Sequence, residues 1–278
     1  MPETIGFMTI RTSPRQAALA ACLVLTLAAG RAAAQQPDQP TVEPAPDKPE
    51  FMSRADFQLS ASAFANDDIR FSWDAHFGGS LDIADYVAGR AGIYVDYEAV
   101  LGDEFRIFDP NQGNYTLETF ATVRASTSTE IMGMFHHVSR HLSDRPKRFA
   151  IAWNVLGARI LHQVHAGGAT FDIDLEGGKV VQHSYVDYSW IGELHLQARR
   201  PITRAVAVYG RAVGQIVGVN GDVARDSQRG GSAEAGLRLK GRAGTMELFA
   251  GVERRVDADP LDRQPQTWAL AGFRLLSR

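Results

Sequence analysis

The sequence has a single cysteine, Cys22, among its 278 residues. It lies in the apolar run near the start of the chain, and only the short stretch AALAA precedes it in that run. We interpret it as part of the run rather than as a lipidated cysteine, because the run continues well past it. The rest of the chain has no thiol, which excludes a disulfide framework and thiol chemistry in the folded part.

The chain also lacks a strong charge of either sign. Its formal net charge is −3 at pH 7. A nucleic-acid-binding domain is expected to carry a basic patch or stripe and a clear basic surplus. The sequence therefore predicts no nucleic acid among the partners of this protein.

Only one long apolar run occurs, and it resembles a targeting segment. Arg11 and Arg15 precede AALAACLVLTLAAG, and RAAAQQ follows it. A basic start, an apolar core and a small-residue cleavage site are typical of a secretory signal peptide, and the run is short for a membrane-spanning helix. Residues 1–34 are thus predicted to be a signal peptide. The proline-rich residues 35–52 are predicted to be a linker, which leaves residues 53–278 as the folded domain.

Sustained helical periodicity is missing after the linker, and alternation of apolar and polar residues takes its place. In one such run Phe71, Trp73, Ala75 and Phe77 alternate with polar or small residues. This period of two is the pattern of β-strands, and turn sequences such as NDD, DPNQG, SDRP, AGG and NGD separate the runs. Twelve strands are predicted, over residues 54–65, 69–83, 88–102, 114–126, 128–141, 148–164, 168–177, 183–199, 203–218, 230–241, 244–256 and 265–277.

Two features of these runs favour a membrane barrel over a soluble sandwich. Their polar faces are dense in Asp, Glu, Arg and His while their apolar faces are nearly free of charge, and the runs are longer than most soluble strands. A closed barrel with apolar side chains outside and polar ones inside crosses the outer membrane without unpaired backbone groups. We therefore predict an all-β, antiparallel transmembrane barrel of about twelve strands in the bacterial outer membrane.

The aromatic residues support the prediction of a membrane barrel, whereas the last residues of the sequence do not. Interfacial girdles could be supplied by Trp73, Tyr97, Tyr115, Tyr188, Trp190 and Trp268. The chain ends in FRLLSR rather than in an aromatic residue, which departs from the usual ending of outer-membrane barrels.

Polar residues on the apolar face of two neighbouring strands are the main functional observation. In the strand 128–141 the charged residues have even numbers, so His137 and Ser139 are expected to face lipid. In the strand 148–164 the same argument turns Asn154 toward lipid. Pairing about the turn SDRPKR sets His137 directly opposite Asn154, with Ser139 two residues along the same face.

These three residue types can form a hydrolytic site. Ser139 is the candidate nucleophile, His137 its base, and Asn154 the group that orients the histidine. At a lipid boundary the expected substrate is a lipid ester. The alternative is that all three residues lie in the polar headgroup zone without catalysing anything, in a structural barrel or a small pore.

The stretch GMFHHVSRHLSDRPKRFAIAWNVLGARI resembles the active-site hairpin of the outer-membrane phospholipase A family, a family of twelve-stranded barrels. The shared pattern is H-x-S on one strand, a short turn and then W-N. The resemblance implies calcium as a cofactor, a homodimer, membrane lipids as substrate and His137, Ser139 and Asn154 as the catalytic residues. It assigns the calcium loop to Arg140, Ser143 and Asp144. Lipid A deacylation is a further alternative, because other H-x-S barrels perform it.

Two other groups of polar residues have ordinary explanations. The histidines of this region are expected to be solvated residues of the rim or lumen rather than metal ligands, since neighbours on a strand face opposite sides; they are His136, His137, His141, His162 and His165. The acidic row Asp172, Asp174 and Glu176 is expected to line the lumen, paired with Arg159, Arg199 or Arg211 on neighbouring strands.

Overall fold

A computed structural model describes residues 41–143, 149–221 and 224–277 of the chain. The predicted signal peptide and the first part of the predicted linker lie outside these residues. Every regular element in the described part is a β-strand, and there are twelve of them. They are β1 (Glu50–Ala65), β2 (Trp73–Asp85), β3 (Arg90–Gly102), β4 (Asp109–Ser126), β5 (Thr129–Leu142), β6 (Ile151–Ala166), β7 (Ala169–Ser184), β8 (Tyr188–Pro201), β9 (Val206–Val219), β10 (Gln228–Lys240), β11 (Thr245–Asp259) and β12 (Gln264–Leu276).

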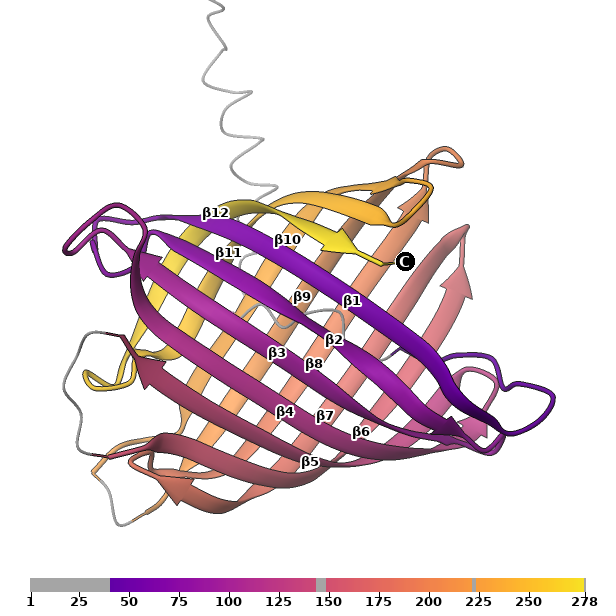
Figure 1. The fold of residues 1–278 in the computed structure, drawn as a ribbon, viewed down its shortest axis with the longest axis horizontal. Coiled ribbons are helices and arrows are strands. Elements are labelled where there is room, and N and C mark those ends of the chain that lie inside the picture. Colours follow the sequence, from indigo (N-terminus) through magenta and orange to yellow (C-terminus); the bar gives the residue numbers. More distant parts are fainter. Residues whose placement is uncertain (1–40, 144–148, 222–223, 278) are drawn as a thin grey trace, which may run out of the picture.

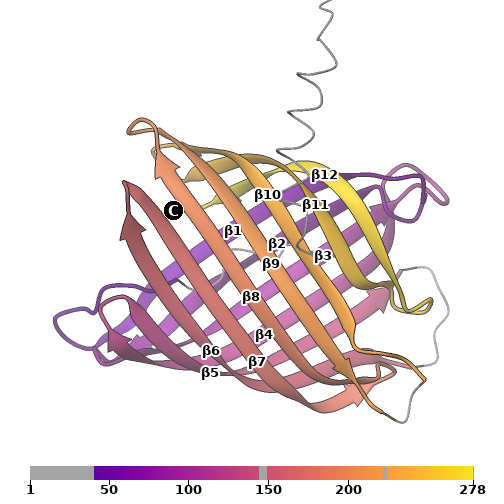
Figure 2. The same ribbon diagram turned by 180° about the vertical axis from the view of Figure 1, so that it is seen from behind.

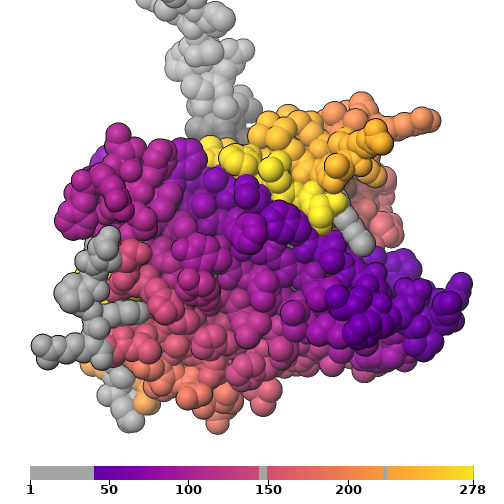
Figure 3. All heavy atoms as spheres, viewed as in Figure 1, coloured from indigo at the N-terminus to yellow at the C-terminus, as the bar shows by residue number. Residues whose placement is uncertain are grey.

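The strands form a closed antiparallel barrel in sequence order (Figure 1). The far wall, seen from behind in Figure 2, includes β6 to β10. Strands β1 and β12 pair with each other from Gln58 and Leu276 to Ala65 and Ala269, which closes the barrel. Side chains of β1 to β5 cover the near wall as a continuous surface (Figure 3). The prediction of a twelve-stranded all-β barrel is confirmed.

Within the described residues no helix is long and apolar enough to cross a membrane.

The two ends of the barrel differ in the length of their connections. One end, at the left of Figure 1, carries the longer ones, such as 66–72, 143–150 and 220–227. The other end carries short turns, such as 127–128 and 167–168. In bacterial outer-membrane barrels short turns face the periplasm and longer loops face outward. By that criterion the β5–β6 connection lies at the outer end.

The turn between β6 and β7 illustrates how the sequence specifies these short connections. Gly167 and Gly168 have φ angles of 58° and 76°. Both values fall in the left-handed region, which two-residue hairpin turns require and which glycine adopts without steric cost. The predicted turn AGG is therefore the observed one.

The outer wall is apolar, as the alternation predicts. Ile131 and Phe135 on β5 and Leu156 and Ile160 on β6 are between 39% and 60% exposed. In a barrel such exposed apolar side chains form the lipid-facing belt. Their neighbours in the sequence point inward and are buried.

Buried ion pairs line the lumen. Arg159 has no exposed surface, and its Nη2 lies 3.1 Å from Oε2 of Glu118; it also pairs with Glu176. Asp172 pairs with Arg199, with Oδ2 and Nη2 2.6 Å apart. The expected pairing of the acidic row thus involves Arg159 and Arg199. Arg211 on β9 instead pairs with Glu234 on the neighbouring strand β10, with Nη1 and Oε1 3.4 Å apart. Such charge pairing fits a plugged barrel better than an open pore.

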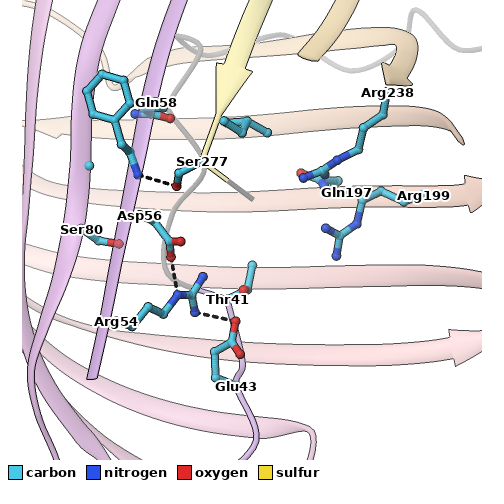
Figure 4. A pocket seen from close by; sticks show the side chains of 13 residues that line it. Thr41, Glu43, Arg54, Asp56, Gln58, Ser80, Gln197, Arg199, Arg238 and Ser277 are labelled. Atoms are coloured by element: carbon cyan, nitrogen blue, oxygen red, sulfur yellow. Dashed lines mark hydrogen bonds and ion pairs between the residues drawn. The ribbon is translucent and has the colours of Figure 1, made fainter. Parts of the chain in front are cut away.

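The described residues before β1 enter the lumen at the short-turn end. The carbonyl oxygen of Thr41 accepts a hydrogen bond of 3.0 Å from Nη2 of Arg90, and Val42 packs against a lumen cluster of apolar residues. Beside this segment is a cavity of about 250 Å³, shown in Figure 4. Across the cavity from Arg54, which pairs with Glu43 at 2.6 Å, lie Arg199 and Arg238.

Candidate active site

His137 and Asn154 meet on the lipid-facing side of β5 and β6. They are direct cross-strand partners, as the position of the turn predicts. Nδ1 of His137 lies 2.6 Å from Oδ1 of Asn154. Because the amide oxygen can only accept a hydrogen bond, Nδ1 carries the proton and Nε2 is the basic nitrogen. Among the described residues, no other hydrogen bond to this ring is found.

Ser139 lies two residues further along the same face, but its hydroxyl does not contact His137. Its Oγ lies 3.0 Å from Nε2 of His141, the next outward-facing residue of β5. Histidines thus flank the serine on both sides along one strand. The structure brings Ser139, His137 and Asn154 onto one surface patch, and it connects only the last two by a direct hydrogen bond.

Gln182 extends this polar patch onto β7. Nδ2 of Asn154 donates a hydrogen bond of 2.8 Å to Oε1 of Gln182. The pairing of β6 with β7 shifts register between Asn154 and Val155, so that Gln182 comes opposite Asn154 while Val180 faces Val155. Gln182 fixes which way the Asn154 amide points, since the amide nitrogen is engaged and the oxygen is directed at His137.

Aromatic side chains adjoin the serine on its other side. Tyr115 on β4 is the cross-strand partner of Ser139 and is 50% exposed. Its ring packs edge-on against His141, with centroids 5.2 Å apart, and contacts Tyr97 at 5.0 Å. Tyrosines at this position are typical of the interfacial girdle of a membrane barrel. The patch therefore adjoins a pair of neighbouring, exposed tyrosines.

The structure describes two of the three residues predicted for a calcium loop, Arg140 and Ser143. The side chain of Arg140 points into the lumen, where its Nη1 donates a hydrogen bond of 2.6 Å to the carbonyl oxygen of Asp257. Arg140 thus faces away from Ser139, since neighbours on a strand point to opposite sides. Ser143 follows β5, and its backbone N–H donates to the carbonyl oxygen of Asn111 at 3.0 Å. Asp144 lies outside the described residues.

The remaining histidines of this region are dispersed. His136 is buried in the lumen, with Nδ1 3.1 Å from Oε2 of Glu118. His162 contacts the hydroxyl of Thr129 at 2.9 Å. His165 lies 3.1 Å from the hydroxyl of Thr170 near the β6–β7 turn. In the described part of the chain these rings do not share a ligand position with His137 or His141.

Solved structures with a similar fold include outer-membrane phospholipases. The Salmonella typhi outer-membrane phospholipase (OMPLA) dimer with bound calcium is 12% identical over 80% of this chain and 90% of its own, with a TM-score of 0.50. Outer-membrane phospholipase A from Escherichia coli is 14% identical over 79% of this chain and 92% of its own, with a TM-score of 0.50. An active-site mutant of the E. coli enzyme, in which alanine replaces an asparagine, is 15% identical over 87% of this chain and 94% of its own, with a TM-score of 0.50.

At these identities the comparison establishes the fold. The chain is a twelve-stranded barrel that resembles bacterial outer-membrane proteins. No family model matches the sequence, and no curated protein matches it.

Proposed function

We propose that this barrel is an acyl hydrolase that cleaves ester bonds of outer-leaflet phospholipids. Ser139 is the nucleophile, His137 the general base and then the general acid, and Asn154 the residue that orients His137. The observation that carries the proposal is the 2.6 Å contact between Nδ1 of His137 and Oδ1 of Asn154 on the lipid-facing wall. An oriented histidine beside a serine is the arrangement that activates a hydroxyl nucleophile.

The position of the patch supports a lipid ester as substrate. Unpaired polar groups in apolar surroundings cost roughly 1–3 kcal/mol each, so a polar cluster on the lipid-facing side needs a reason. The neighbouring rings of Tyr115 and Tyr97 support a position of the patch near the headgroup level, where the ester bonds of a phospholipid lie. A substrate could therefore reach Ser139 from within the membrane without crossing the barrel wall.

The reaction begins with a change of hydrogen-bond partner. The Ser139 hydroxyl leaves His141 and turns toward Nε2 of His137. Its Oγ then attacks the ester carbonyl carbon while its proton passes to that nitrogen. The imidazolium is stabilised by its bond to Asn154 and returns the proton to the departing alcohol. Water then attacks the acyl-serine while the same histidine takes its proton. The bond to Ser139 Oγ breaks, the histidine returns the proton to that oxygen, and the fatty acid is released.

The oxyanion that forms on the carbonyl needs a positive partner or a backbone N–H. Arg140 does not supply it, because its side chain occupies the lumen. A calcium ion, which the Salmonella phospholipase dimer binds, would supply such a charge. Calcium prefers oxygen ligands. Arg140 offers it no side-chain oxygen, whereas Ser143 offers a hydroxyl at the end of β5. Homodimer formation is part of the same proposal, supported by that dimer.

The test is release of fatty acid from a fluorescent phospholipid by the purified barrel in detergent with excess Ca²⁺. Ser139→Ala is expected to abolish release. Ser184→Ala is the matched control. Ser184 is the last residue of β7, at the same end of the barrel as Ser139, and its hydroxyl donates a hydrogen bond of 2.9 Å to the carbonyl oxygen of Ala150. Heat-modifiable migration on a gel shows that each variant is folded.

Equal and low release by the wild type and Ser139→Ala, with all three proteins folded, would contradict the proposal. The protein would then be a structural barrel whose polar patch contacts lipid headgroups. This second candidate is favoured by the hydrogen bond of the Ser139 hydroxyl, which joins it to His141 and not to His137. Release from lipid A but not from glycerophospholipid would support the deacylase alternative instead.

A further inference from the structure

The lumen contains a second cluster of chemically reactive side chains, which the proposed hydrolase does not use. It is formed by Asp74 and His76 on β2 and Glu98 on β3. One ligand atom from each of these residues lies within 4.8 Å of the others. Asp74 and His76 are buried and Glu98 is partly buried. The cluster faces inward, whereas the Ser139 patch faces lipid.

The histidine of this cluster is held in the orientation typical of a metal ligand. Its Nδ1 lies 2.8 Å from Oδ2 of Asp96, and its Nε2 is directed toward Asp74. His76 is only 8% exposed, yet its Nε2 has no hydrogen-bond partner among the described residues; Oδ2 of Asp74 is 3.4 Å away. A carboxylate on one ring nitrogen and a metal on the other is the usual arrangement around a metal-bound imidazole.

The charge balance also favours an additional cation. Four carboxylates meet here, those of Asp74, Asp96, Glu98 and Glu253. Among the described residues, the guanidinium that lies between these carboxylates is that of Arg255. Its nitrogens lie 2.5 Å from Oδ2 of Asp74, 2.8 Å from Oε1 of Glu98 and 2.8 Å from Oε1 of Glu253. Buried carboxylate oxygens remain without a hydrogen bond, namely Oδ1 of Asp74, Oδ1 of Asp96 and Oε2 of Glu253.

We propose that the lumen binds a divalent transition-metal ion of the Zn²⁺ type through Asp74, His76 and Glu98, with Asp96 positioning the imidazole. One imidazole nitrogen and two carboxylates suit Zn²⁺ or Co²⁺, whereas Ca²⁺ and Mg²⁺ prefer oxygen ligands alone. The ion would link β2 to β3, and its positive charge would balance the carboxylates that Arg255 does not neutralise. This role is structural and does not depend on hydrolysis.

Cobalt is the probe, because Co²⁺ in such a site absorbs visible light. The full chain is refolded into detergent with Co²⁺ or with EDTA and then desalted. We expect stoichiometric Co²⁺ with visible absorption in the wild type and loss of both in His76→Gln. The matched control is His195→Gln, because His195 is another lumen histidine, with Nε2 3.0 Å from Oε2 of Glu193. It should retain Co²⁺.

Two further measurements keep the result interpretable. Asp96→Asn, which preserves the size of the side chain, is expected to weaken Co²⁺ binding roughly 10–100-fold. Zn²⁺ should displace Co²⁺ from the wild type, and Ca²⁺ should not. The proposal is overturned if the folded wild type retains no Co²⁺, or if folded His76→Gln retains as much. Protonated His76 and Arg255 would then balance the carboxylates without a metal. Phospholipase activity is not part of this readout, so either proposal can fail alone.

Discussion

The imidazole of His137 and the side-chain amide of Asn154 face each other across β5 and β6, with Nδ1 2.6 Å from Oδ1. The amide nitrogen of Asn154 donates in turn to Gln182. This chain of two hydrogen bonds runs across three neighbouring strands and fixes the proton of His137 on Nδ1. Nε2 is then left as the base on the face that carries Ser139. Because the orienting group is a neutral amide, no carboxylate anion has to be buried there.

Replacement of Asn154 tests whether this orientation serves catalysis. We expect Asn154→Ala to lower kcat for phospholipid hydrolysis by about 10²-fold, because the histidine loses its fixed tautomer. KM should change little, since Asn154 does not contact the acyl chain in the proposed reaction. Asn154→Asp keeps an acceptor oxygen and should retain more activity than the alanine variant. Wild-type kcat in folded Asn154→Ala would exclude Asn154 as the orienting residue.

The two histidines beside Ser139 can be distinguished by the same assay. His137→Ala is expected to abolish turnover, because His137 is the histidine with an orienting partner. His141→Ala is expected to change turnover only a few-fold, since its bond to Ser139 Oγ belongs to the resting arrangement. The reverse result, with His141 essential and His137 dispensable, would assign the role of base to His141.

Much of this arrangement follows from the sequence alone. The alternation predicts the strands and which side chains face outward, and the turn SDRPKR predicts the register that pairs His137 with Asn154. The hydrogen bond of Ser139 to His141 does not follow, because side-chain torsions depend on neighbours such as Tyr115 on another strand. The position of Gln182 depends on a register shift in β7 that the sequence does not indicate.

Contacts across the lumen are harder still to anticipate from the sequence. Arg255 on β11 reaches Asp74 on β2 and Glu98 on β3. Strand alternation says only that all three point inward. Which inward residues lie at the same height depends on how far the strands are staggered around the closed barrel. The cluster with His76 is therefore visible only in the structure.

Replacement of Arg159 tests how much the buried ion pairs of the lumen stabilise the barrel. Its guanidinium is fully buried and pairs with Glu118, Glu176 and Asp174. Arg159→Gln is expected to lower the free energy of unfolding by about 3–5 kcal/mol, because it leaves buried carboxylates without their cation. The measurement is a urea titration of the folded barrel in lipid vesicles. Arg204→Gln, in the exposed β8–β9 turn, is the control and should change the same quantity little. Equal effects of the two substitutions would mean that the lumen pairs are solvated.

Arginine substitutions at two isoleucines test whether the apolar outer wall is embedded in lipid. Ile160 lies on the outer face of β6, between its cross-strand partners Ile131 and Leu175, and is 46% exposed. Ile160→Arg is expected to lower the free energy of unfolding in vesicles by about 2–4 kcal/mol, because a charge near the bilayer midplane must leave water.

The matched substitution is Ile202→Arg. Ile202 is 61% exposed and lies in the short turn between β8 and β9, beyond the lipid-facing belt. An arginine there remains in water, so the same change of side chain should cost about 0–1 kcal/mol. The comparison uses urea titration of both variants in the same vesicles. A similar loss at both positions would show that the wall around Ile160 does not face the bilayer core. The route proposed for a lipid substrate, from the membrane directly to Ser139, would then have no basis.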